Sequence, residues 1–462
     1  MLGEITENKY DVTYEGDVRV VTAKFWADCE DKIGTYMEDT DWDFIVEEDT
    51  DFYAPSNFGN ENNEDNIIFK YRKNIFTADE QLGAYDGLLG AAQPTQNRGM
   101  AAGPKGETQG QRDWCTDEQV EIMDYFIHRP NSSTLFEEEG DPIENIKQKY
   151  INAEGTTRGI VWLRTKIDDA GYNYKSFFSD KVKEWKEMSV EEASKDANVI
   201  KSTFISDTTY ANVVLSGIAG FFDRYPRIPY GRATSYTEHN RETFEKCYPF
   251  MRKLSNEFAN LLPKRYGVQL NAANKLDERF RVAGKDTPFT TITVNKNFRT
   301  ACHRDAGDLN EGFSNLTVVA KDKNWTGGYL VLPEFRVGIN IRPGDLLLIN
   351  NHGGIHGNTE LLPPEGVAIE DMERISLVCY FREKMLELGS WEYETLRRNF
   401  VDYRRKDKSH PLWKHLWNGV SEKMWDSDEW YEYLKEHGGV NMLELYHPKA
   451  VEEKPSLESF FE

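Results

Sequence analysis

Two histidines and one aspartate have the spacing of a mononuclear iron site. His303 and Asp305 follow the β-rich run ITVNKNF, and His356 lies 51 residues after Asp305. Alternate residues of a strand point to the same side, so His303 and Asp305 can converge on one ion while a distant strand supplies the third ligand. Two imidazoles and a carboxylate hold Fe(II) by one octahedral face and leave three positions open, which suit a bidentate 2-oxo acid and O₂. The sequence therefore predicts His303, Asp305 and His356 as metal ligands and catalytic residues.

An arginine further along the chain can serve the same chemistry. Arg374 lies 18 residues after His356 and opens the β-rich run RISLVCYF. A buried guanidinium binds the distal carboxylate of 2-oxoglutarate through two parallel hydrogen bonds, which lysine does poorly. Ser376 lies two residues on, faces the same side of the strand, and can add a hydroxyl donor. We therefore expect Arg374 and Ser376 to bind this co-substrate.

Other polar residues near these positions are weaker candidates. His352 competes with His356 as the third ligand, because both lie in the run NHGGIHGN. We favour His356 and expect His352 to support the site or to face the substrate. Asn297 and Arg299 lie on the strand that leads to His303, so they are candidate contacts to the substrate or to the C1 carboxylate of 2-oxoglutarate. Hydrogen bonding within the β-rich core explains Asn297 and Arg299 equally well.

Six short β-rich runs must position these residues. They are TTITVNKNF, SNLTVVAK, GGYLVLPE, VGINIRP, GDLLLIN and RISLVCYF, and glycine, proline and asparagine separate them. Short strands with tight turns are typical of a β-barrel or jelly roll. Helix-like periodicity precedes and follows this block, so the expected class is α+β. In the preceding part, Pro249 must kink a helix over 244–261 or mark its true start.

The chain divides into six parts by composition and periodicity. We assign them as an acidic N-terminal α+β segment (1–83), a flexible loop rich in Gly, Ala and Gln (84–112), a helix-rich part (113–287), the β-rich catalytic core (288–385), C-terminal aromatic and basic helices (386–450) and a flexible tail (451–462). Long loops inside compact proteins are usually functional or disordered. The loop over 84–112 carries Arg98, Lys105 and Arg112, and we expect it to face the substrate.

Composition limits the class of protein. The 462 residues are 39% hydrophobic and 13% aromatic, which is enough for a large core and excludes global disorder. No apolar run approaches the ~18 residues of a membrane helix, and the N-terminus does not have the pattern of a signal peptide. We read the five scattered cysteines as free thiols. The expected location is the cytoplasm, meaning the host cytosol for a viral protein, or the nucleus in a eukaryote.

The charge is strongly negative but unevenly distributed. A formal net charge of −23 argues against simple electrostatic adhesion to nucleic acid. Two stretches are basic nonetheless: residues 224–265 carry nine Lys/Arg against four acids, and residues 397–414 carry seven against two. Such stretches are either solvated helix faces or local surfaces for nucleic acid, and the sequence leaves both readings open.

The catalytic block resembles the oxygenase domain of the TET/JBP family, with most likeness to its phage and protist members. The runs that carry the resemblance are His303-Arg-Asp305, Gly312-Phe-Ser-Asn-Leu-Thr-Val-Val319, His356-Gly-Asn-Thr359 and Arg374-Ile-Ser-Leu-Val378. The resemblance covers about 288–385 and implies a double-stranded β-helix, of the jelly-roll or cupin type, flanked by N- and C-terminal helices. It implies Fe(II) at the two histidines and the aspartate, and 2-oxoglutarate at Arg374 and Ser376.

The resemblance also implies a substrate. Family members use Fe(II), 2-oxoglutarate and O₂ to hydroxylate the 5-methyl group of a pyrimidine base in DNA. Such an enzyme must flip the base out of a duplex or act on single strands. Whether the base is thymine or 5-methylcytosine stays open, and no cysteine-rich zinc region is present.

The sequence is also compatible with two other functions and with one further partner. The same iron chemistry could act on a protein side chain or a free nucleotide, or the chain could be a non-catalytic DNA-binding or clamp-associated module. The tail carries Lys454, Leu457, Phe460 and Phe461 at the spacing of peptides that dock on replication sliding clamps. Those peptides usually have glutamine at the position of Lys454, and packing of the two phenylalanines on the protein itself is the alternative.

Overall fold

The computed structural model describes most of the chain outside one long central segment. The described residues are 8–58, 66–104, 212–407 (apart from 226–227, 306 and 322–323), 409–410, 425–437 and a few positions between 180 and 192. The chain separates into two compact units, residues 1–104 with 212–462 and residues 105–211. All the elements below belong to the first unit.

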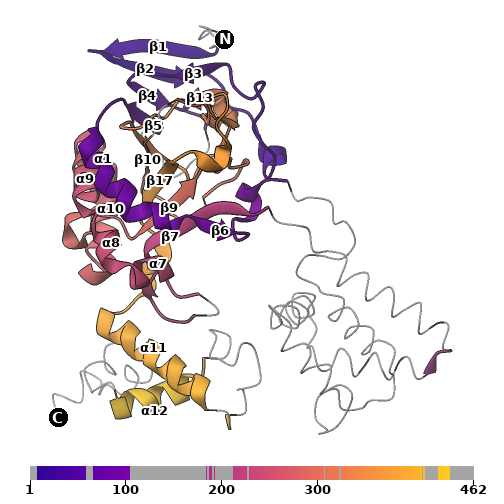
Figure 1. The fold of residues 1–462 in the computed structure, drawn as a ribbon, viewed down its shortest axis with the longest axis vertical. Helices are drawn as coiled ribbons and strands as arrows, with labels where there is room; N and C mark the ends of the chain where they lie inside the picture. The colour runs from indigo at the N-terminus through magenta and orange to yellow at the C-terminus, as the bar shows by residue number, and fades with distance from the viewer. Residues whose placement is uncertain are drawn as a thin grey trace, which may run out of the picture. The chain divides into compact units, whose positions relative to one another are not determined.

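A large mixed sheet forms the centre of this unit (Figure 1). Its strands, in spatial order, are β1 (Tyr10–Glu15), β2 (Val18–Ala23), β4 (Thr50–Tyr53), β5 (Ile67–Arg72), β14 (Leu346–Ile349), β10 (Ser314–Ala320), β17 (Arg374–Tyr380), β9 (Thr291–Lys296), β7 (Val214–Phe222) and β6 (Gln93–Thr95), with β8 (Arg232–Ala233) beside β7. Strand β5 pairs antiparallel with β14. The acidic N-terminal strands therefore extend the same sheet as the catalytic core.

A smaller sheet packs against one face of the large one. It contains β15 (Gly357–Asn358), β12 (Leu330–Leu332), β13 (Val337–Ile339) and β3 (Phe44–Val46), and β11 (Thr326–Gly327) pairs with β16 (Leu361–Leu362) nearby. Leu347 and Ile349 of the large sheet share an apolar core with Leu330 and Val337 of the small sheet. Two facing sheets around one core fit a jelly-roll arrangement.

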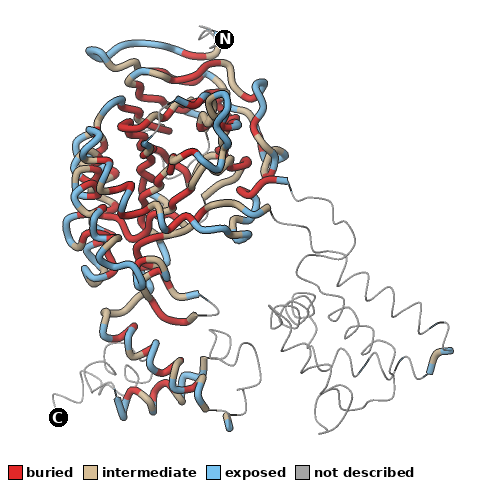
Figure 2. The backbone as a smooth tube through the Cα atoms, viewed as in Figure 1, coloured by how far each residue is buried: buried red, intermediate tan, exposed pale blue. Residues whose placement is uncertain are grey.

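Helices cover the opposite face of the large sheet (Figure 1). They are α1 (Ala78–Leu88), α7 (Ser235–His239), α8 (Arg241–Glu245), α9 (Tyr248–Leu261) and α10 (Pro263–Ala273). Because side chains alternate along a strand, Leu346 and Leu348 of β14 point to this side and pack with Met251 and Leu254 of α9. Figure 2 shows the buried residues gathered along the strands of the sheet. The polar cavity described below lies on the other face of the large sheet, which these helices do not cover.

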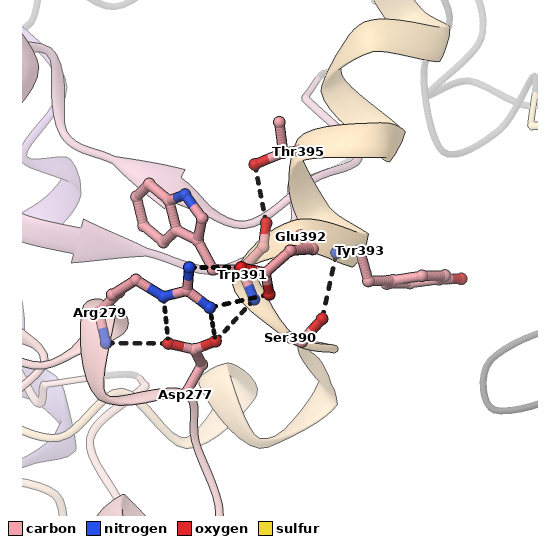
Figure 3. A network of polar contacts seen from close by, with 7 residues as sticks. All are labelled: Asp277, Arg279, Ser390, Trp391, Glu392, Tyr393 and Thr395. Atoms are coloured by element: carbon pink, nitrogen blue, oxygen red, sulfur yellow. Dashed lines mark hydrogen bonds and ion pairs between the residues drawn. The ribbon is translucent and has the colours of Figure 1, made fainter. Parts of the chain in front are cut away.

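The C-terminal helices are α11 (Trp391–Lys406) and α12 (Ser427–His437), and a polar network fixes the start of α11 (Figure 3). The Asp277 carboxylate accepts a hydrogen bond of 3.0 Å from the backbone N–H of Trp391 and pairs with Arg279 at 2.5 Å. Arg279 also pairs with Glu392 at 2.5 Å. The Ser390 hydroxyl caps α11. The start of α11 is thus bound to the loop that precedes the core strands.

Short 3₁₀ turns connect these elements. They are Glu30–Lys32, Leu89–Ala91, Gly99–Ala102, Glu278–Phe280, Gly284–Asp286, Pro333–Phe335, Ile369–Asp371 and Glu383–Glu387. No helix among the described residues is both long and apolar enough to span a lipid bilayer. Four of the five cysteines lie in the described part, and all four are buried free thiols.

The six predicted strands are all present as β9, β10, β12, β13, β14 and β17. Pro249 lies in the first turn of α9, so it marks the start of that helix and does not kink it. The expected loop from residue 84 is wrong as far as residue 102, because this stretch completes α1 and forms β6 and two 3₁₀ turns. Strand β7 in the part expected to be helical was also missed, since its sequence VLSGIAGFF contains two glycines.

Candidate active site

The three predicted metal ligands meet at one point of the fold. An isolated antiparallel bridge joins His303 and His356: each backbone N–H donates to the other's carbonyl, at 2.9 and 3.0 Å. The Nε2 atoms of the two histidines lie 3.4 and 3.7 Å from the Asp305 carboxylate oxygens. One ligand atom from each of the three residues lies within 4.8 Å of the others. Backbone pairing therefore holds residues from distant parts of the chain in a metal-binding arrangement.

Hydrogen bonds to the backbone orient both imidazole rings. The Nδ1 of His303 lies 2.7 Å from the Ala301 carbonyl oxygen, and the Nδ1 of His356 lies 3.2 Å from that of Gly354. A carbonyl only accepts, so each Nδ1 carries the proton and donates it. In a neutral ring this leaves the Nε2 lone pair free to face a metal.

The charges of the site favour a cation. Burial alone would raise the pKa of Asp305, but the hydrogen bond with His303 and the field of the two histidines lower it to about 2. Burial and the neighbouring His303 lower the pKa of His356 to about 4. Asn351 donates a hydrogen bond of 3.0 Å from its Nδ2 to the Asp305 carboxylate. The carboxylate is therefore charged and oriented, and His356 is neutral at pH 7, as metal ligation requires.

Arg374 lies buried on the face of β17 that looks towards these ligands. Its side chain makes no ion pair with any described residue, and its Nε has no hydrogen-bond partner. Burial and the nearby Arg342 lower the pKa of Arg374 to about 10. The guanidinium lies 5.6 Å from the centre of the Trp325 ring. A buried cation without an anion is costly, so this environment suits a carboxylate that enters from outside the chain.

One cavity of about 320 Å³ contains the metal ligands together with Arg374 and Ser376. That volume is at the lower end of the range for small-molecule sites. A larger, open hollow of about 1100 Å³ lies over α1, β6, β7 and α7 but contains none of the three metal ligands. We place the chemistry in the smaller cavity because the converging charged groups are there.

Comparison with known proteins agrees with this geometry. Residues 217–383 match the Tet_JBP family model, described as the oxygenase domain of the 2OGFeDO superfamily. This region is similar to the Tet_JBP oxygenase domain. All five residues predicted to bind the metal or the 2-oxo acid lie within it.

Similar proteins include thymine dioxygenases of trypanosomatids. The chain is 32% identical to the thymine dioxygenase JBP1 of Leishmania braziliensis over 215 residues, which are 45% of this chain and 24% of that protein. It is 33% identical to JBP1-B of Trypanosoma cruzi over 203 residues, 42% of this chain and 23% of that protein. The chain thus spans about a quarter of the length of these relatives. A structure of NgTET1 in complex with 5mC DNA aligns over 44% of this chain and 70% of the other at a TM-score of 0.29 and 16% identity.

This cavity is also lined by polar residues that the sequence did not indicate. Asp308 is buried beside the metal ligands, and burial raises its pKa well above the usual range. Arg382 pairs with Asp223 at 3.0 Å and stacks on Phe222 at 4.0 Å. Asn351 is the asparagine immediately before His352 in the run NHGGIHGN, so its position beside two candidate ligands was a usable signal. Nothing in the sequence distinguished Asp308 or Arg382 from surface residues.

Three predicted residues do not line the cavity. His352 lies at a narrow gap beside it, and His356, not His352, clusters with His303 and Asp305. The side-chain amide of Asn297 donates to the carbonyls of Ile369 and Met372 at 2.8 and 2.7 Å. Arg299 donates to the Met37 carbonyl at 2.8 Å. Asn297 and Arg299 therefore hold loops around the Tet_JBP core, and their assignment to substrate binding remains a prediction without structural support.

The two basic stretches are largely engaged within the chain. Arg397 donates to the Pro229 carbonyl, and the ion pairs are Arg224–Glu394, Arg241–Glu245, Arg252–Asp286, Lys253–Glu257, Arg398–Glu238, Arg404–Glu429 and Arg405–Asp402. Side chains with partners in the fold are poor candidates for binding phosphate. The structure therefore favours the reading of these stretches as structural or solvated helix faces. Lys105, Arg112 and the tail residues Leu457, Phe460 and Phe461 lie outside the described residues.

Proposed function

We propose that this protein is an Fe(II)- and 2-oxoglutarate-dependent dioxygenase that hydroxylates the 5-methyl group of a pyrimidine base in DNA. The observation that carries the proposal is one cavity holding a His–Asp–His cluster together with a buried arginine that has no anionic partner among the described residues. The Tet_JBP match and the thymine dioxygenase relatives support the same chemistry and suggest the substrate class.

The donor set fits a divalent iron and a keto diacid. His303 and His356 offer Nε2 and Asp305 offers a carboxylate, which is the facial set that leaves open positions on Fe(II). When bound, the iron with 2-oxoglutarate and O₂ supplies the oxidising power to hydroxylate a C–H bond. Arg374 and Ser376 hold the distal carboxylate, and the Nδ1–H donors of both histidines keep their rings aligned. The proposed frame for these residues is a double-stranded β-helix.

The substrate base must leave the base stack of the DNA duplex before it can enter the cavity. A 5-methyl group within a duplex cannot reach a buried metal, so the nucleotide is flipped out or comes from a single strand. Asp308, Tyr380 and Arg382 line one wall of the cavity and offer hydrogen-bonding groups to the edge of a pyrimidine. The names of the relatives make thymine the first substrate to test and 5-methylcytosine the second. An enzyme acting on DNA would reside in the cytoplasm, or in the nucleus of a eukaryotic cell.

Nucleoside mass spectrometry tests the proposal. The full chain is incubated with Fe(II), 2-oxoglutarate and oligonucleotides containing thymine or 5-methylcytosine, each single-stranded and duplex, and succinate is measured in parallel. We expect a hydroxymethyl base in at least one DNA and none with Asp305→Ala. Succinate formation without any modified base would move the substrate to a protein side chain or a free nucleotide. Absence of both, in protein that retains bound iron, would leave only a non-catalytic module.

A sliding clamp is a separate proposed partner, based only on the sequence of the tail. Leu457, Phe460 and Phe461 have the spacing of a clamp-docking peptide. A pull-down with the clamp of the source replication system should recover the wild-type chain and lose the Phe460→Ala/Phe461→Ala double variant. Equal recovery of both chains would exclude the peptide as the docking element.

A further inference from the structure

Another arginine of the cavity comes from a part of the chain outside the Tet_JBP match. Arg98 lies between β6 and the 3₁₀ turn Gly99–Ala102, and it lines the cavity with Asn97 and Ala101. The Ala301 N–H donates a hydrogen bond of 2.9 Å to the Ala101 carbonyl. This bond ties the segment to the strand end that carries His303, so the position of Arg98 is fixed relative to the metal ligands.

A chain of buried polar groups orients the Arg98 guanidinium. Its Nε donates to the Ser216 hydroxyl at 2.7 Å, and this hydroxyl donates in turn to Asn295 Oδ1 in a short hydrogen bond. Ser216 and Asn295 are buried and face each other across strands β7 and β9. Asn295 in turn faces Ser376 on β17. These hydrogen-bonded side chains bind Arg98 through its Nε and leave its two Nη atoms without a hydrogen-bond partner among the described residues.

Arg98 has no acidic partner among the described residues. Neither an ion pair nor a second side-chain hydrogen bond is found for its guanidinium in that part of the chain, although the protein carries 79 acidic residues. Burial lowers the pKa of Arg98, and the field of Tyr380 and Asp305 opposes this shift. Most other arginines near the site are paired, as Arg304 is with Glu30 and Glu334. The site thus keeps two guanidinium groups for anions that the described chain does not supply.

The two guanidinium groups differ in depth. Arg374 is only 6% exposed, at the closed end of the cavity between β17 and Trp325. Arg98 is half-buried and its neighbours Asn97 and Gly99 are exposed, so it lies where the cavity meets solvent. A co-substrate carboxylate belongs at the closed end, whereas a base that enters the cavity leaves its sugar and phosphates at the mouth.

We propose that Arg98 is a substrate-binding residue that holds a phosphodiester beside the nucleotide whose base occupies the cavity. This inference rests on the proposed function, because it assigns the contact that positions the DNA. The planar guanidinium can bind Ser216 through Nε while its Nη atoms donate to a phosphate, which the single ammonium of lysine cannot do in the same geometry. Residues outside the family domain then contribute to the substrate site.

The test compares Arg98→Met, Arg98→Lys and Arg241→Gln with the wild type. Arg241 is an exposed arginine on α8 that pairs with Glu245, so Arg241→Gln is the matched loss of one positive charge away from the cavity. Fluorescence anisotropy of a labelled thymine-containing oligonucleotide is measured with Mn(II) in place of Fe(II) over a range of salt. KM values for DNA and for 2-oxoglutarate are measured with Fe(II).

We expect Arg98→Met to weaken DNA binding about tenfold and to reduce the slope of log K against log salt by about one. Arg98→Lys should recover part of the affinity, and the KM for 2-oxoglutarate should stay unchanged. A raised KM for 2-oxoglutarate with unchanged DNA affinity would assign Arg98 to the co-substrate and overturn the proposal. An effect as small as that of Arg241→Gln would also overturn it.

Thermal unfolding and the wild-type arm separate the remaining outcomes. Loss of DNA affinity together with a large fall in Tm would assign Arg98 a structural role through Ser216; Ser216→Ala, which removes the anchor and keeps the charge, should then reproduce the fall in Tm. If the wild-type chain neither binds nor modifies DNA, the proposed function fails and this inference falls with it. If the wild type modifies DNA and Arg98→Met behaves like wild type, only this inference fails.

Discussion

Arg374 of the cavity differs from the buried arginines of helix α11 in the partners that the fold gives it. Arg374 has no anionic partner in the described part of the chain, although it is buried. Arg397 and Arg404 of α11 are equally buried, but Arg397 donates to the Pro229 carbonyl at 2.8 Å and lies over Trp425, and Arg404 pairs with Glu429 at 2.9 Å. The α11 residues stabilise the contact of the C-terminal helices with the rest of their unit. The cavity arginine is left for a ligand.

This difference shows why local basic density is a poor guide to an anion site. Residues 397–414 contain seven basic residues, whereas the run around Arg374 contains one. An isolated guanidinium among apolar strands has no anion beside it to offset its charge. A guanidinium on a helix surface usually finds an acid one turn away or across an interface. The informative property is the missing partner, which only the folded chain reveals.

We expect the largest effect from a substitution at Arg374. Arg374→Met should weaken 2-oxoglutarate binding by about 100-fold or more, because it removes a bidentate, desolvated charge contact. Titration of 2-oxoglutarate into metal-loaded protein gives the affinity, and iron content measured in the same samples should not change. Arg397→Met is the matched control, since it also removes a buried arginine. Equal 2-oxoglutarate affinity for wild type and Arg374→Met would place the co-substrate elsewhere.

A second effect concerns a cavity residue that already has its partner. Asn351→Ala removes the hydrogen bond that orients the Asp305 carboxylate and should lower metal affinity by roughly 10- to 100-fold, the usual range for outer-shell partners of a metal ligand. Competition between the protein and a chelator of known affinity measures the change. Asn297→Ala, which alters an amide outside the cavity, should leave metal affinity within about twofold. A similar loss in both variants would indicate a general disturbance of the core.

The sequence predicted the parts of the site that depend on local pattern. Arg374 and Ser376 lie on β17, whose alternation is visible in the chain, so their shared direction followed from the period of a strand. His303 and Asp305 lie between β9 and β10, outside both strands, and the isolated bridge of His303 with His356 brings them to the site, so the expected strand alternation does not explain their convergence. His356 followed from its interval to the Arg374 strand. Spacing alone placed these residues in one site before any contact was known.

Residues whose role depends on distant pairing could not be predicted. Arg98 hydrogen-bonds to Ser216, which lies 118 residues further along the chain. This contact requires β6 to pair with β7, and the two glycines of β7 hide its strand pattern in the sequence. Strands β1, β2, β4 and β5 join the core strands of the large sheet through the pairing of β5 with β14, and β3 joins the small sheet by pairing with β13. Register between such segments is decided by burial in three dimensions, which a local pattern does not encode.

A third effect concerns Arg397 of α11. Arg397→Met should destabilise the protein by about 3 kcal/mol, because it removes a buried charged hydrogen bond to Pro229 and a cation–π contact with Trp425. Urea unfolding followed by circular dichroism measures the loss. DNA affinity of the folded variant should remain within about twofold of wild type, the level expected where no phosphate contact is lost. A selective loss of DNA affinity without a change in stability would show that residues 397–414 form a surface for nucleic acid.

The smallest effect concerns Asp277, which joins the core to the start of α11 (Figure 3). The hydrogen bonds from Arg279, helped by the Trp391 N–H and opposed by burial, lower the pKa of Asp277 from its ordinary value of 3.8 to about 2. A carboxyl whose pKa is lower in the folded state stabilises the fold above its unfolded pKa and loses this contribution as the pH falls through the folded value. Asp277→Asn should therefore cost on the order of 1 kcal/mol at pH 7, since Arg279 is 46% exposed and solvent weakens the pair.

The pH dependence of this variant distinguishes charge from shape. Because the amide introduced by the substitution does not titrate, the difference in unfolding free energy between wild type and Asp277→Asn should stay constant from pH 7 to about 5 and shrink between about pH 4 and pH 2. Glu392→Gln removes only the more exposed partner of Arg279 and should have a smaller effect at every pH. If the Asp277→Asn difference is the same at pH 3 as at pH 7, the carboxylate acts through its hydrogen bond to Trp391, and its charge contributes nothing to holding α11.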